Sequence, residues 1–154
     1  MNDFHLHMMA NHLPTVLPAV GMVVVLVAFL MRSAVAQRFG YGIIVCAALS
    51  APIAGSSGER IEHEVERFEG VDRRTIHEHE EAVERFVPFL FGLGALSLVG
   101  LVVSWRMPDR RKLQVVLVAG TLVLGTVVMG LAYRAGETGG LIRHPEIADD
   151  WNWD

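Results

Sequence analysis

Seven histidines and a set of carboxylates are the residues of this chain that could do chemistry. The histidines are His5, His7, His12, His63, His77, His79 and His144. Imidazole binds zinc, copper, iron and nickel alike, and carboxylates can complete a mixed shell of nitrogen and oxygen ligands. Whether these side chains meet depends on the segments that separate them.

Four long segments without Asp, Glu, Lys, Arg or His predict four transmembrane helices. They are approximately residues 13–31, 39–57, 86–105 and 113–133. Each is about 20 residues long, the length of helix that crosses a hydrocarbon core, and a helix satisfies its own backbone polar groups there. With 52% hydrophobic residues, residues 1–154 are predicted to form a single all-α domain, an integral membrane four-helix bundle.

The basic residues predict how the bundle is oriented. Six of the 13 basic residues flank the turns after spans one and three, whereas 16 of the 17 acids lie on the opposite side. The positive-inside rule places the two turns in the cytoplasm. We therefore expect a multi-pass protein of the bacterial inner membrane, N-out and C-out, with every histidine and the 59–85 segment on the extracytoplasmic side.

Several functional classes are disfavoured by the same distribution of residues. Apart from Cys46 and two tyrosines, no ionisable residue lies within a span, whereas pumps and transporters of charged substrates place charges inside the membrane. One cysteine forms no disulfide framework and no Cys-x-x-Cys-His haem attachment. The acidic 59–85 segment argues against nucleic acid binding.

The 59–85 segment is expected to be helical and to carry ligands near the bundle. Span two is predicted to end at a flexible break, residues 55–58, and two short helices are predicted to follow, divided near Gly70. On a helix, His79 falls within the apolar stripe of Ile76 and Phe86, whereas His77 falls on the other face. His79 is therefore predicted to point inward and His77 outward.

The ends of the spans supply the other candidate ligands. His12 immediately precedes span one and His144 follows span four, so we expect both to approach His79. Glu59, Glu62 and Glu80 are the predicted carboxylate ligands, although Glu59, Glu62 and His63 could equally form a solvated acidic face. Arg143, Asn11 and Glu146 are expected to support the ligands. The weaker candidate ligands are His5, His7, His63 and His77.

Short motifs at the span ends resemble a known family. Asn11-His12-Leu13-Pro14, Gly58-Glu59 with Glu62, His79-Glu80, and the run from Gly139 to Glu146 look like a family of four-span bacterial membrane proteins. Related domains of unknown function carry a His-Pro motif and are sometimes joined to c-type cytochrome domains. The resemblance covers most of the chain and implies that these are recurring polar positions. By analogy alone, the cytochrome association favours redox chemistry.

Three functional hypotheses follow. The first is a transition-metal site (Zn, Cu or Fe) built from His12, His79, His144 and glutamates, with a redox role. The second is a b-type haem with two axial imidazoles, from His12 and His79 or from His79 and His144. The third is a cofactor-free accessory or scaffold subunit. The expected partners are the lipid bilayer, a redox protein such as a cytochrome, and a homo-oligomer or larger membrane complex.

Overall fold

The computed structural model describes residues 3–65 and 73–144, and these residues are helical apart from short turns. No strand occurs in this part of the chain, so the all-α prediction is confirmed. Four stretches of helix are long and apolar enough to cross a membrane, as the charge-free segments predict. The helices are α1 (Asp3–Ala10), α2 (His12–Leu30), α3 (Ala34–Val65), α4 (Arg73–Arg106) and α5 (Arg111–Arg143).

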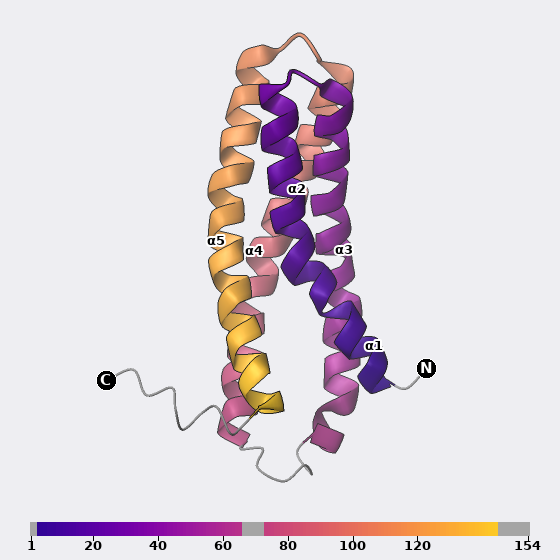
Figure 1. Cartoon of the computed structure of the whole chain (residues 1–154), viewed down its shortest axis with the longest axis vertical. Coiled ribbons are helices and arrows are strands. Elements are labelled where there is room, and N and C mark those ends of the chain that lie inside the picture. The colour runs from indigo at the N-terminus through magenta and orange to yellow at the C-terminus, as the bar shows by residue number, and fades with distance from the viewer. Residues whose placement is uncertain (1–2, 66–72, 145–154) are drawn as a thin grey trace, which may run out of the picture.

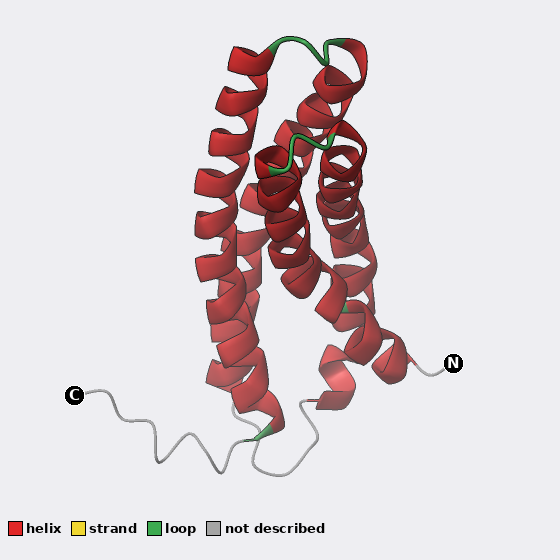
Figure 2. Cartoon of the chain, turned by 45° about the horizontal axis from the view of Figure 1, so that its top comes forward, coloured by secondary structure: helices red, strands yellow, loops and turns green. Residues whose placement is uncertain are grey.

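The long helices form two antiparallel hairpins, α2–α3 and α4–α5. The turns that join them, residues 31–33 and 107–110, lie together at one end of the bundle, here called the loop end (Figure 2). At the opposite end, here called the histidine end, α1 and α4 begin and α3 and α5 finish (Figure 1). The hairpins pack α3 on α4 and α2 on α5, and α1 packs mainly against α3. The histidine end therefore brings together four helix ends that are distant in sequence.

Small residues let the helices approach closely. A Cβ built on Gly40 of α3 would lie 2.7 Å from the backbone nitrogen of Val25 in α2 and 3.0 Å from the carbonyl oxygen of Gly21. This contact between backbones is the type that small residues make possible in membrane helix pairs. Around it, Tyr41 and Ile44 of α3 are almost completely buried.

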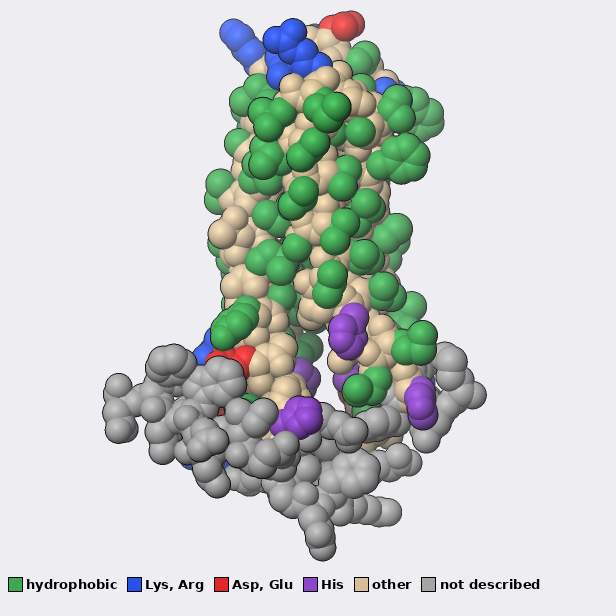
Figure 3. Space-filling model, viewed as in Figure 1, with side chains coloured by type: hydrophobic (Ala, Val, Ile, Leu, Met, Phe, Trp, Pro, Cys, Tyr) green, Lys and Arg blue, Asp and Glu red, His purple; other side chains and the backbone are tan. Residues whose placement is uncertain are grey.

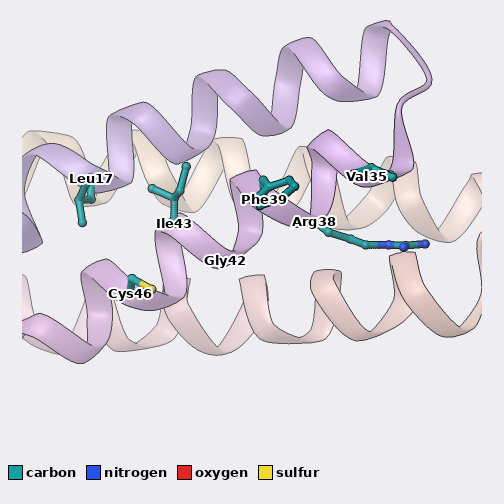
Figure 4. Close-up of a pocket in the computed structure, with 7 residues that line it drawn as sticks. All are labelled: Leu17, Val35, Arg38, Phe39, Gly42, Ile43 and Cys46. Carbon is teal, nitrogen blue, oxygen red and sulfur yellow. The ribbon is translucent and has the colours of Figure 1, made fainter.

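The outer surface of the bundle is apolar over most of its length (Figure 3). Leu30, Val116 and Val123 are each more than 60% exposed, and a belt of such side chains suits lipid rather than water. An apolar groove of about 540 Å³ lies on this surface, lined by Leu17 and a face of α3 that includes Cys46. Figure 4 shows the Arg38 side chain at one end of the groove, extended toward the loop end. The chain is a multi-pass membrane protein by these features.

The predicted break after span two is wrong. Helix α3 continues through residues 55–58 to Val65, and α4 begins at Arg73, so both helices extend beyond their charge-free spans. Glycine costs about 1 kcal/mol in a helix interior relative to alanine, but the packing of α1 against this part of α3 compensates for it. The expected division near Gly70 lies outside the described residues.

Candidate ligand site at the histidine end

His7 of α1 is held against α3 by its ring nitrogen. Its Nδ1 lies 3.0 Å from the carbonyl oxygen of Ala54 and 3.2 Å from Oγ of Ser57, and the residue is half-buried. A backbone carbonyl only accepts hydrogen bonds, so Nδ1 must carry the proton. The neutral His7 ring therefore has its lone pair on Nε2.

His79 of α4 is held against α5 in the same way. Its Nδ1 lies 3.0 Å from the carbonyl oxygen of Ala135 and 3.1 Å from Oγ1 of Thr138. The residue is half-buried, and Thr138 is buried beneath it. The same argument from the carbonyl acceptor assigns the proton to Nδ1 and the lone pair to Nε2. Neither Nε2 is hydrogen-bonded to another described residue.

A glycine provides the space for each imidazole. A Cβ added to Gly58 of α3 would lie 3.0 Å from Cε1 of His7 and 3.3 Å from its Nδ1. A Cβ added to Gly139 of α5 would lie 3.0 Å from Cε1 of His79 and 3.3 Å from its Nδ1. Real Cβ atoms rarely approach other atoms this closely. Each ring thus lies in a seat, meaning an alanine carbonyl, a hydroxyl and a glycine on one helix.

The two seats have the same sequence pattern. Residues 54–58 read Ala-Gly-Ser-Ser-Gly and residues 135–139 read Ala-Gly-Glu-Thr-Gly, so both are Ala-Gly-x-(Ser/Thr)-Gly. Each motif contacts a histidine from an earlier helix, His7 of α1, 47 residues before Ala54, and His79 of α4, 56 residues before Ala135. Hence the hairpins are structurally equivalent at the histidine end. The positions of the histidines alone do not reveal this, whereas the repeated Ala-Gly-x-(Ser/Thr)-Gly motif is present in the sequence.

The two seats also lie close enough to influence each other. The charge-free part of α4, residues 86–105, begins seven residues after His79, so this imidazole lies outside the membrane-spanning stretch. Burial lowers the pKa of His79 and outweighs the opposing effect of the Ala135 hydrogen bond, while the charges of His7 and Glu80 have smaller effects that lower and raise it, respectively. Figure 3 shows the molecule hollowed between the hairpins at this end, with histidine side chains on both sides of the opening.

Each of the two imidazoles offers one nitrogen atom, Nε2, to an electrophilic centre. A histidine that ligates a metal usually donates its other ring N–H to a carbonyl or carboxylate, which fixes the tautomer and orients the ring. His7 and His79 both meet this condition before any ligand binds. The lowered pKa of His79 also favours the neutral form that coordinates a metal.

The predicted ligands His12, His79 and His144 occupy different surroundings. His12 is exposed, and its Nδ1 donates a hydrogen bond of 2.8 Å to the carbonyl of Met8. His144 caps the end of α5 and is exposed. Among the side chains that the structure describes, no three from His, Cys, Asp and Glu form a group able to hold a metal ion. A site built from this triad stays a prediction.

The remaining candidates are mostly exposed or fall outside the description. His79 does point inward and His77 outward, as the helical phase predicts, because His77 is 71% exposed beside Glu80 and Glu81. His5, Glu59 and Glu80 are exposed, and Asn11 is half-buried with a buried Oδ1 that has no hydrogen-bond partner. The side chains of Glu62, His63 and Arg143, and all of Glu146, lie outside the described residues.

Comparison of the chain with protein-family models, with curated proteins and with solved structures finds no match. The resemblance to a four-span family therefore stays a prediction.

Proposed function

We propose that this chain is a b-type haem protein of the bacterial inner membrane, with His7 and His79 as the two axial ligands. The haem would lie between the hairpins at the histidine end, on the extracytoplasmic side. There it would carry one electron at a time to or from a redox partner such as a cytochrome. This proposal keeps the bis-histidine hypothesis and His79, and replaces His12 and His144 by His7 as the second ligand.

The observation that carries the proposal is the pair of matched seats. Both imidazoles have Nδ1 bonded to an alanine carbonyl at 3.0 Å, and both have an Nε2 that no described residue engages. Two imidazoles held in the same way suit a metal centre that takes the same kind of ligand on its two opposite faces. Haem in electron-transfer proteins is such a centre, held by one axial ligand on each face.

The number of available ligands favours haem over a bare metal ion. A porphyrin supplies four nitrogen atoms in its plane and requires only two from the protein, which matches the two seats. A bare ion requires three or four protein ligands.

Apolar residues close to the seats also suit a macrocycle. Three such residues are each at least 90% buried. Ala10 follows His7 by three residues, Ile61 follows Gly58 by three, and Ile76 precedes His79 by three. Arg143 remains the proposed partner of a haem propionate, because its guanidinium can bind a carboxylate with two hydrogen bonds.

Haem titration of the purified full-length protein in neutral detergent tests the proposal. We expect a Soret band that saturates at one haem per chain. His7→Ala and His79→Ala should each weaken haem binding strongly, because each removes one axial ligand. His77→Ala is the matched control, because it removes an exposed imidazole two residues from His79, and it should bind haem as the wild type does. Equal haem affinity in His79→Ala and His77→Ala would refute the assignment.

A transition-metal ion is the second candidate. Glu59 follows Gly58 and Glu80 follows His79, so each seat has a carboxylate next to it in sequence. Those carboxylates could join the two imidazoles around Zn, Cu or Fe after a change of side-chain rotamer. Elemental analysis distinguishes the two candidates, since stoichiometric zinc or copper without a Soret band would favour the ion. Finding neither metal nor haem would leave a cofactor-free accessory subunit as the better description.

A further inference from the structure

A pocket of about 390 Å³ opens at the loop end, the opposite end from the two seats. Both turns and the first turns of α3 and α5 contribute to it. None of the lining residues is acidic, and neither α3 nor α5 carries an acidic residue in its first turn. The lining residues are Arg32, Ala34, Gln37, Pro108, Arg111 and Gln114.

Gln37, one of the lining residues, carries a buried donor that is unsatisfied. The residue is only 3% exposed, and its Nε2 has no hydrogen-bond partner within the described part of the chain. The amide also lies near the Tyr41 hydroxyl, but not in hydrogen-bonding geometry. By contrast, Nε2 of Gln114 donates to the carbonyl of Pro108 at 2.7 Å. A buried amide donor without an acceptor is costly, so a ligand that accepts hydrogen bonds would stabilise Gln37 in this position.

The two arginines that line the pocket favour an anion as that ligand. The guanidinium of Arg111 lies 3.9 Å above the centroid of the Phe29 ring, a cation–π contact that restrains its position. Arg32 occupies the other wall with a φ of 56°, a left-handed conformation that glycine adopts more easily than arginine. The amino ends of α3 and α5 add the partial positive charge of two helix dipoles.

We propose that this pocket binds a phosphate group. Guanidinium groups match phosphate oxygens with paired hydrogen bonds, and the Gln37 amide supplies a further donor from the buried side. Two sources offer the same chemistry, namely the headgroup of an anionic phospholipid at this surface of the membrane and free inorganic phosphate.

Two binding experiments on the full-length protein test the proposal and separate the sources. The first incubates the protein in mixed vesicles of phosphatidylglycerol and phosphatidylcholine and measures retained lipid by native mass spectrometry. The second titrates inorganic phosphate by calorimetry into the protein in neutral detergent. Each uses Arg32→Gly, which removes a guanidinium but suits the backbone, and Gln37→Met. The control is Lys112→Gln, which removes a neighbouring exposed charge that does not line the pocket.

We expect the wild type to retain phosphatidylglycerol over phosphatidylcholine, to bind inorganic phosphate, or both, and the arm that responds identifies the source. Arg32→Gly and Gln37→Met should weaken that binding about tenfold, because each loses a hydrogen bond to a charged group. Lys112→Gln should change it less than about twofold. No binding in either arm, or an equal loss in Lys112→Gln, would overturn the proposal. If Gln37→Met does not fold, Arg32→Gly decides the outcome.

Discussion

The imidazoles of His7 and His79 are held in the same way, His7 of α1 against α3 and His79 of α4 against α5. Each Nδ1 lies 3.0 Å from the carbonyl oxygen of an alanine. Each Cε1 lies 3.0 Å from the position of a Cβ atom added to the nearby glycine. The histidine and the alanine are 47 residues apart in the first arrangement and 56 residues apart in the second. A hydrogen bond of this kind leaves Nε2 as the coordinating atom, which is the basis of the proposal that the two rings bind one centre.

Replacing the seat glycines should displace the imidazoles. In Gly58→Ala and Gly139→Ala the new methyl group would contact the ring at 3.0 Å, so the ring or the helix must move. We expect haem affinity to fall about tenfold or more, the usual effect of disturbing the groups that orient a ligand. Optical titration measures this affinity.

Each seat glycine has a matched control three residues earlier. Nothing lies within 4 Å of a Cβ added to Gly55 or Gly136, so Gly55→Ala and Gly136→Ala should bind haem like the wild type. If the control and seat variants lost affinity equally, helix flexibility rather than ring contact would explain the glycines.

Removing a seat hydroxyl should weaken the docking of α1 on α3. In Ser57→Ala, Nδ1 of His7 loses one of its two acceptors, and a hydrogen bond contributes about 1 kcal/mol to stability. The free energy of unfolding, measured by denaturant titration in mixed micelles, should decrease by about that amount. Ser56→Ala is the control, because Ser56 is exposed and bonds only to the Ile53 carbonyl of its own helix. A decrease of equal size in Ser56→Ala would show that the seat contact adds no stability.

His79 should make the protein less stable as the pH falls. Because its pKa in the folded protein lies below the ordinary 6.5, the unfolded chain takes up the proton first. Stability is therefore independent of His79 above pH 6.5, decreases as the pH falls through the folded pKa, and then levels off. The groups that act on the ring are His7 of α1 and Glu80 of α4, together with the carbonyl of Ala135 in α5.

Comparison of two variants isolates this dependence on pH. The loss of unfolding free energy below pH 6.5 should be smaller in His79→Gln than in the wild type, whereas His77→Gln should retain the full loss. An NMR titration of the His79 ring should place its midpoint below 6.5. A midpoint at or above that value would contradict the burial of the ring.

Close packing between α2 and α3 should make Gly40 sensitive and its neighbour Gly42 tolerant. A Cβ on Gly40 would collide with the backbone of α2, whereas nothing lies within 4 Å of one on Gly42. Gly40→Ala should therefore lower the free energy of unfolding by about 1–3 kcal/mol, the cost of overpacking. Gly42→Ala should leave stability unchanged or slightly higher. Equal stability of the two variants would argue against the direct backbone contact.

The sequence was sufficient to predict the four spans and the inward position of His79, one of the two histidines that lie in the seats. Absence of charge over 86–105 identifies a membrane helix because the hydrocarbon core excludes charge. The position of His79 follows from a helical phase that Ile76 and Phe86 define locally.

The second seat could not be predicted in the same way. His7 precedes the first span, where terminal residues are often poorly ordered, and its position depends on Ala54, Ser57 and Gly58, about 50 residues away. Gly55 and Gly58 predict a break because glycine has a low helix propensity. The helix nevertheless continues in the structure, where α1 packs on α3. Contacts distant in sequence therefore determine which second histidine is held in the same way as His79.

Electron paramagnetic resonance of the ferric haem complex tests the central claim most directly. Two axial imidazoles should give a low-spin, six-coordinate iron in the wild type, and His7→Ala or His79→Ala should each convert it to a high-spin form. His12→Ala and His77→Ala should keep the wild-type spectrum. A low-spin spectrum that survives the loss of both His7 and His79, or the absence of bound haem, would contradict the account.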